Sequence, residues 1–172
     1  QKALKEELPS NYCYQDMFRG CINLKETPEL KFTNAANYCC QNMFNGCIKL
    51  ESGPLELLSE RINVGGYDGM FYGCTKLKTA PIIHANSVGS VGCRNMFRDC
   101  TSLITTPPVL SAMTIENDCY NCMFHTCSNI TSVPDLPATT LATNCYYSMF
   151  TNCKNIESIK IYAESLATNS CQ

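Results

Sequence analysis

The stretch Met-Phe-Arg-Gly-Cys-Ile-Asn-Leu at residues 17–24 decides the fold, because its pattern of Met-Phe, Cys and a closing Leu or Ile returns five more times. The copies begin at Met17, Met43, Met70, Met96, Met123 and Met149, so the interval from one copy to the next alternates between 26 and 27. A fixed period of this size is typical of proteins built from stacked repeats. One such unit is too small to bury its own apolar residues, so we expect each unit to pack against its neighbours.

Aligning the copies on Met gives columns of equivalent residues. The position eight residues before Met is always apolar, and we expect it to face inward: Ala35, Ile62, Val88, Ile115 and Leu141. This column fits one face of a short helix or helical turn. The same face would carry the small residue four before Met, the Met, the Phe and the following Cys. Glycine occurs three residues after Met in three units, at Gly20, Gly46 and Gly73, which predicts a tight turn there.

A proline column predicts where each strand ends. We expect a short strand over residues 24–30 and its equivalents, limited by a proline eleven residues after Met because proline cannot donate to a sheet ladder. The column consists of Pro28, Pro54, Pro81, Pro107 and Pro134, with Lys160 in the last unit. The longer units carry their extra residue between this proline and the next unit, which predicts a variable outer loop.

The columns divide the chain into one array. The predicted units are 13–38, 39–65, 66–91, 92–118, 119–144 and 145–170, and a seventh begins at residue 171. Residues 1–12 are either an N-terminal cap, with Leu4 and Leu8 on one face of a short helix, or the remnant of an upstream repeat. A start without Met leads us to expect a processed product or a part of a longer chain.

Composition excludes several classes of partner. The chain has 172 residues and a formal charge of −2, from 13 basic and 15 acidic residues, which gives no electrostatic reason to expect nucleic acid or a membrane surface as a partner. No apolar run approaches the roughly 18 residues that span a bilayer, so no direct membrane insertion is expected in this segment. The oligomeric state is not determined by these features.

The repeat columns resemble the BspA-like leucine-rich repeats of bacterial surface proteins. Residues 134–153 carry nearly the whole pattern, Pro-Asp-Leu-Pro-Ala-Thr-Thr-Leu-Ala-Thr-Asn-Cys-Tyr-Tyr-Ser-Met-Phe-Thr-Asn-Cys, and the resemblance covers residues 13–171. It implies a repeat solenoid, a leucine-rich-repeat-like right-handed superhelix with one short strand and a short helix or helical turn in each unit. It further implies a secreted or cell-surface protein, often one with a role in adhesion, without catalytic residues.

The fourteen cysteines allow two interpretations. A disulfide between cysteines eight apart within each unit fails, because Cys74 would have to pair with Gly66. In a helix such positions also lie about 12 Å apart, beyond the reach of a disulfide. Buried, reduced thiols are the first interpretation. Occasional disulfides between neighbouring units remain the second.

One cluster has the residue types of a zinc site: Cys119, Cys122, His125 and Cys127. Cys119 and Cys127, however, belong to columns that the other units fill without any metal ligand nearby. The sequence also has no glycine-rich phosphate loop and no evident base beside a cysteine nucleophile. We therefore expect no enzymatic activity, no metal and no cofactor.

Two columns suggest a binding surface, because they flank the predicted strand and vary while the core columns stay fixed. We expect one of them to project from the concave face of the solenoid. They lie eight and nine residues after Met: Lys25, Glu26, Glu51, Ser52, Lys78, Thr79, Ile104, Thr105, Thr131, Ser132, Glu157 and Ser158. The simpler alternative is that they are only solvated strand positions.

These features predict an extracellular or bacterial cell-surface module that binds a macromolecular partner in adhesion. The partner would be a protein or a glycan on a host or neighbouring cell. The alternative is a structural spacer that presents another domain, for example in a phage fibre or a multidomain wall protein. A third hypothesis, a cysteine-based metal or redox protein, predicts bound zinc or readily titrated thiolates.

Overall fold

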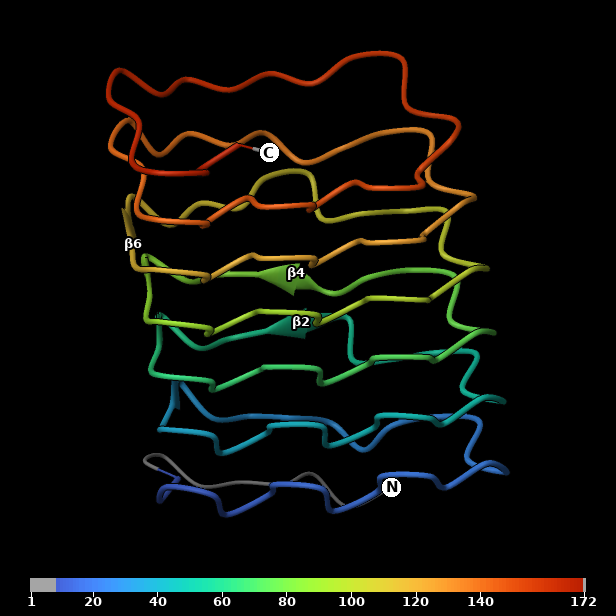
Figure 1. Ribbon diagram of the computed structural model, residues 1–172. Helices are drawn as coiled ribbons and strands as arrows, with labels where there is room; N and C mark the ends of the chain where they lie inside the picture. Colours follow the sequence, from blue (N-terminus) through green and yellow to red (C-terminus); the bar gives the residue numbers. More distant parts are fainter. Residues whose placement is uncertain (1–8, 172) are drawn as a thin grey trace.

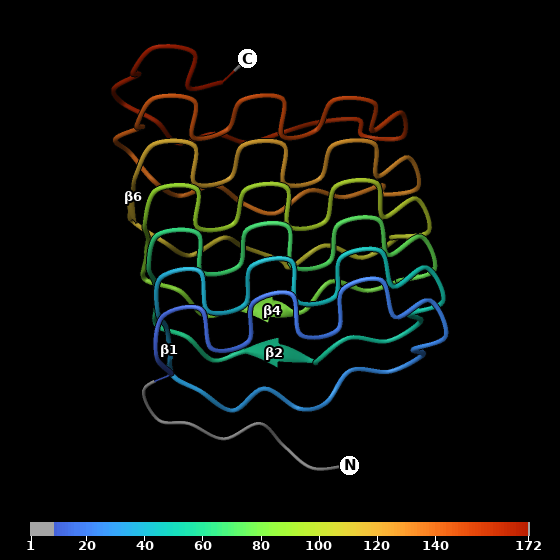
Figure 2. The same cartoon turned by 60° about the horizontal axis from the view of Figure 1, so that its bottom comes forward.

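The computed structural model describes residues 9–171 and shows a stack of coiled rungs, one rung for each repeat unit (Figure 1). Each rung has two long sides, which Figure 2 separates into a scalloped layer and a smoother layer behind it. We call the scalloped layer the turn side; around Met43 it comprises residues 36–47. We call the other layer the extended side; in the rung that follows Met43 it comprises residues 54–58. The expected cap carrying Leu4 and Leu8 lies outside the described residues.

A narrow parallel sheet joins the two sides along one edge (Figure 2). Its strands come from four consecutive units and have the order β1-β3-β5-β6. They are β1 (Asn34–Ala35), β3 (Arg61–Ile62), β5 (Ser87–Val88) and β6 (Thr114–Ile115). The second residue of each strand is buried, and these residues are the column eight before Met. The inward orientation predicted for that column is confirmed, although it was not predicted to lie in a strand.

The extended side has little regular pairing. It contains one two-stranded parallel sheet, β2 (Glu56–Leu57) with β4 (Ile82–Ile83), and single bridges such as Val109 to Asp135. The strand predicted over residues 24–30 is reduced in the first unit to isolated bridge residues, Glu26 and Leu30, of which Glu26 pairs with Ser52. The following proline has no N–H to continue the ladder, which accounts for the short pairing.

The helix predicted before and around each Met is not found: residues 9–171 contain no helix. The segment is a run of overlapping reverse turns, in which every second N–H closes a turn within its own unit. Met17 N, for example, donates to Tyr14 O at 3.3 Å. The intervening N–H groups donate to the next unit, as Phe18 N does to Met43 O at 2.9 Å.

Left-handed backbone at every fourth residue explains why this segment cannot be a helix. Around each of the six Met residues, the residues five before, one before and three after it have a positive φ; around Met43 they are Tyr38, Asn42 and Gly46. A right-handed helix does not tolerate such residues, whereas a turn with a positive φ at its third residue requires them. The tight turn predicted at Gly20, Gly46 and Gly73 is therefore confirmed, with φ of 70°, 73° and 70°.

The core consists of ladders in which equivalent side chains stack. Six phenylalanines, from Phe18 to Phe150, stack ring on ring with neighbouring centroids 5.4–5.7 Å apart. The cysteine four after Met lies beside them, and from the second unit onward its thiol donates to the phenylalanine carbonyl of the preceding unit at 3.0–3.2 Å. Cys47, for example, donates to Phe18 O. The cysteines of this column are free thiols, as in the first of the two interpretations above.

The glycines that replace cysteine in the third and fourth units fit the local packing. A Cβ at Gly92 would lie 2.7 Å from Val88 Cγ1, and a Cβ at Gly66 would lie 3.0 Å from Ile62 Cγ2. The branched side chains of Ile62 and Val88 therefore occupy the space that a cysteine side chain would need.

The register of the extended side locates the extra residue of the longer units. Glu56, two residues after Pro54, pairs with Ile82, which directly follows Pro81. Leu55 is thus the inserted residue of the second unit, and its side chain is 90 % exposed. In the same way, the pairing of Val109 with Asp135 identifies Pro108 as the inserted residue of the fourth unit. The extra residue lies after the proline, as the sequence predicts.

Candidate interaction surface

The two columns proposed as a binding surface lie next to each other along the stack, and all twelve residues are exposed. The backbones of the first four units are paired here two by two: Glu26 bridges to Ser52, and Thr79 bridges to Thr105. We call this set of twelve residues the exposed row. In its first four units the side chains therefore project from a backbone that hydrogen bonds hold in place, as the one from Ile104 N to Lys78 O at 2.9 Å does.

Shallow hollows adjoin the exposed row near both ends. One is lined by Glu26 and Ser52 together with Pro54 and Leu55. The other is lined by Ser132, Glu157 and Ser158 among others. The row carries two bases, Lys25 and Lys78, and three acids, so no single charge sign dominates it. Such a surface suits a partner with mixed polar groups better than a polyanion.

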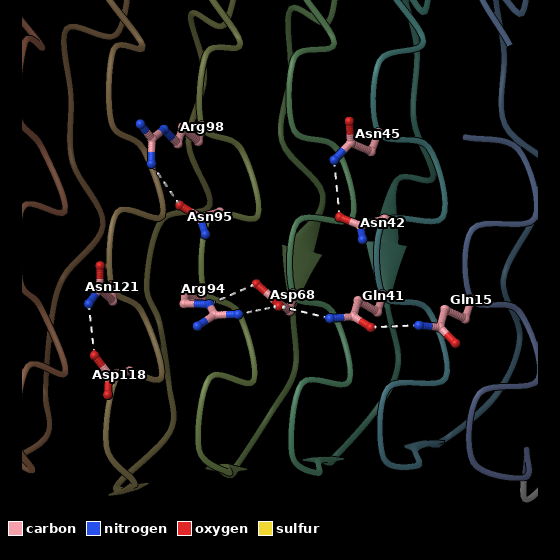
Figure 3. Close-up of polar contacts among 10 residues, drawn as sticks. All are labelled: Gln15, Gln41, Asn42, Asn45, Asp68, Arg94, Asn95, Arg98, Asp118 and Asn121. Carbon is pink, nitrogen blue, oxygen red and sulfur yellow. Dashed lines mark hydrogen bonds and ion pairs between the residues drawn. The ribbon is translucent and has the colours of Figure 1, made fainter. Parts of the chain in front are cut away.

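A second polar surface lies on the turn side and was not predicted from the sequence. Four side chains from consecutive units form a hydrogen-bonded chain that we call the polar ladder (Figure 3). Gln15 Nε2 donates to Gln41 Oε1 at 2.8 Å, and Gln41 Nε2 donates to Asp68 Oδ2 at 3.1 Å. Arg94 then donates from Nε and Nη2 to the two carboxylate oxygens of Asp68 at 3.2 and 2.9 Å.

In the ion pair of the polar ladder the acid is shielded from water, whereas the Arg94 side chain is 41 % exposed. Asp68 is only 4 % exposed, and its hydrogen bond with Arg94 raises the pKa of that guanidinium. A bidentate pair of this kind fixes both side chains. The sequence could have predicted this ion pair. Asp68 and Arg94 occupy the column two before Met, so that an acid and a base lie in adjacent units.

The structure separates the four residues considered as zinc ligands. Cys119 and Cys127 are fully buried in the core, and the Cys127 thiol donates to Phe97 O. Cys122 and His125 are half-buried on the turn side. Among the described residues no group of three or more His, Cys, Asp or Glu side chains could hold a metal ion.

Most repeat cysteines are poor candidates for thiolate chemistry, because they are buried. Burial raises the pKa of Cys74, Cys93, Cys100 and Cys127 well above the usual range of a thiol. Burial likewise raises the pKa of Cys47 and Cys153 to about 11. A thiol with such a pKa is protonated at neutral pH and is neither a nucleophile nor a metal ligand.

Residues 9–171 include no helix that is long and apolar enough to cross a membrane.

Comparison with known families accounts for the repeat. A family model described as BspA type leucine-rich repeat region matches six copies, over residues 7–122 and 110–170. Comparison with curated proteins and comparison with solved structures each gave no match. Repeats of this type generally serve as binding or structural modules and not as enzymes. The six matched copies span nearly the whole chain, which therefore belongs to the family of BspA-type leucine-rich repeat proteins.

Proposed function

We propose that this chain is an extracellular or cell-surface module that binds a macromolecular partner in adhesion. The observation that supports this most is the exposed row, where twelve varying side chains are exposed and eight of them project from backbone that is paired between units. The partner would be a protein or a glycan on a host or neighbouring cell. Family membership supports the same proposal, because repeats of this type are typically found in surface-associated bacterial proteins.

The proposed mechanism is preorganisation. The core columns and the backbone bridges hold the exposed row in one conformation before any partner arrives. Binding then costs little conformational entropy of the backbone, so that modest contacts along several units add up to useful affinity. No chemical step is required of the module.

A cell-binding assay with matched variants tests this proposal. The purified chain, coupled to fluorescent beads, is incubated with a panel of host and bacterial cells. A row variant replaces Lys25, Glu51 and Lys78 with Ala, and a control variant replaces Lys31, Glu60 and Arg61, which are exposed elsewhere on the stack. Each variant loses one acid and two bases, so their net charges match.

We expect the parent to bind at least one cell type, the row variant to bind at least tenfold more weakly, and the control variant to bind within twofold of the parent. Thermal unfolding of all three should agree within a few degrees. Equal losses in both variants would contradict a role for the exposed row. A parent that binds no cell would contradict adhesion and favour a spacer.

A further inference from the structure

Arg98 on the turn side has no carboxylate partner, unlike the two other arginines of that surface. Arg19 lies 3.3 Å from an oxygen of Asp16, and Arg94 binds both oxygens of Asp68. Among the described residues, no acidic oxygen lies within ion-pair distance of Arg98. Arg98 is nevertheless half-buried, and its Nε is fully enclosed without a hydrogen-bond acceptor. A partly desolvated cation without a counter-ion in a native structure needs an explanation.

The Arg98 guanidinium is held in a defined position. Its Cζ lies 5.7 Å from the ring centroid of Tyr72 in the preceding unit, a cation–π arrangement. Its Nη1 donates to Asn95 Oδ1 at 3.4 Å. In Figure 3 the guanidinium turns away from the Arg94–Asp68 pair and toward the unit that carries Asn121. The planar group is therefore oriented before any ligand binds.

The described residues around Arg98 leave this charge uncompensated. Asp68 is already bound by Arg94 and Gln41, and Asp118, hydrogen-bonded by the neutral amide of Asn121 at 2.8 Å, forms no ion pair with Arg98. Asp99, the next residue in the chain, forms no ion pair with Arg98. In the following unit, the columns of Asn95 and Arg98 are occupied by Cys122 and His125, both half-buried.

The Cys122 thiol lies in the positive potential of Arg98 and Arg94. Burial raises the pKa of its thiol, and the charges of Arg98 and Arg94 oppose that rise. Both guanidiniums therefore lie close enough to act on the sulfur. A ligand anion near Cys122 would experience the same attraction.

We propose that Arg98, backed by Tyr72 and flanked by Cys122 and His125, forms a carboxylate-binding subsite on the turn side. The ligand is a carboxylate group carried by an acidic sugar or by an acidic side chain of the partner. A planar carboxylate matches the fork of donors that a guanidinium presents. As part of a recognition surface this subsite rests on the proposed binding function, but the site itself can be tested without any macromolecular partner.

The test uses Cys122 as a built-in reporter. Iodoacetate and iodoacetamide alkylate a thiolate by the same displacement of iodide, but only the first carries a carboxylate. The rate of each reagent at Cys122 is measured by peptide mass spectrometry and divided by its rate at the exposed Cys171. The ratio of the two normalised rates cancels any change in the thiolate population of Cys122.

For the parent we expect iodoacetate to be favoured at Cys122 at least fivefold. In Arg98→Gln the preference should fall to about one, while in Arg19→Gln, a variant of a paired arginine three units away, it should stay within twofold of the parent. The absence of a preference in the parent, or its retention in Arg98→Gln, would overturn the proposal.

A competition experiment on the unmodified parent needs no variant. Glucuronate and N-acetylglutamate, each added in increasing concentration with sodium chloride adjusted to constant ionic strength, should protect Cys122 from iodoacetate in a saturable way. Glucose serves as the uncharged control and should not protect. The more effective of the two acids identifies the source of the carboxylate. Protection by neither acid would overturn the subsite, whereas failure of the bead assay alone would overturn only the proposed adhesion.

Discussion

On the turn side all six units follow the same backbone path, whereas on the extended side the longer units carry one additional residue after the proline. The turn side repeats its left-handed positions and its hydrogen bonds to the next unit with the same spacing throughout. The extended side is paired at short strands and single bridges, and the pairing resumes directly after the extra residues Leu55 and Pro108. Register is therefore fixed on the turn side, and variation in length is tolerated on the extended side.

Single-residue deletions should show the largest difference in stability between the turn side and the extended side. Deleting Asn45 shifts the left-handed positions and the donors of one unit, so we expect a loss of more than about 4 kcal/mol of unfolding free energy, or failure to fold. Deleting Leu55 only shortens the second unit to the length of its neighbours and should cost no more than about 1 kcal/mol. Urea unfolding of both variants checks this. Similar losses would show that the two sides do not differ in tolerance.

Truncation of the phenylalanine ladder should have the next largest effect. Phe97 is fully buried between Phe71 and Phe124, so Phe97→Ala should cost about 3–5 kcal/mol through lost contacts and a cavity. Ile104 in the exposed row is 52 % exposed, and Ile104→Ala should cost less than about 0.5 kcal/mol. Chemical denaturation measures both. A cost below about 1 kcal/mol for Phe97→Ala would argue against the stacked core.

The buried thiols should make stability fall at alkaline pH. The pKa of Cys47 is raised by burial from its ordinary value of 9.0 to about 11, so the folded state holds this proton more tightly than the unfolded state. Its contribution is complete below about pH 9 and is lost as pH rises toward 11. Urea unfolding at several pH values should show this decline, and Cys47→Ala should reduce it. Thr79→Ala, which removes an exposed side chain without a titratable group, should leave the decline as steep as in the parent.

Relief of backbone strain should give the smallest effect, a gain in stability. Val91 has a β-branched side chain at φ 51°, a conformation that suits asparagine better. Val91→Asn should raise the unfolding free energy by about 1 kcal/mol. Val109 is half-buried on the extended side without a positive φ, so Val109→Asn should be destabilising. Thermal unfolding compares the two; destabilisation by Val91→Asn would indicate that packing outweighs strain there.

The repeat, its inward columns and the turn at Gly46 could be predicted from the sequence, because they follow from spacing and residue type. The turn side was wrongly predicted as helical because a run of four-residue turns places apolar residues at nearly the same spacing as a helix does. Residues that disfavour a helix also recur at four-residue spacing, as Asn42 and Gly46 do in the second unit. The column one before Met, which contains Asn42, was therefore the feature of the sequence that indicated consecutive turns in place of a helix.

The side-chain pairing on the turn side could be predicted only in part. The column two before Met places Asp68 and Arg94 in adjacent units, so their ion pair follows once the units are stacked. The isolation of Arg98 does not follow from any column. It depends on which way each guanidinium turns, and that direction is set by Tyr72 and Asn95 around it.

The direction of the hydrogen bonds between units has an electrical consequence. On the turn side five N–H groups around Met43, from Tyr38 to Gly46, donate to carbonyls of the segment around Met70, and the segments around Met70, Met96 and Met123 repeat this orientation. Aligned peptide dipoles add, as they do along the axis of a helix. The turn side is therefore a macrodipole directed along the stack, with its positive pole toward the sixth unit, and each added unit lengthens it.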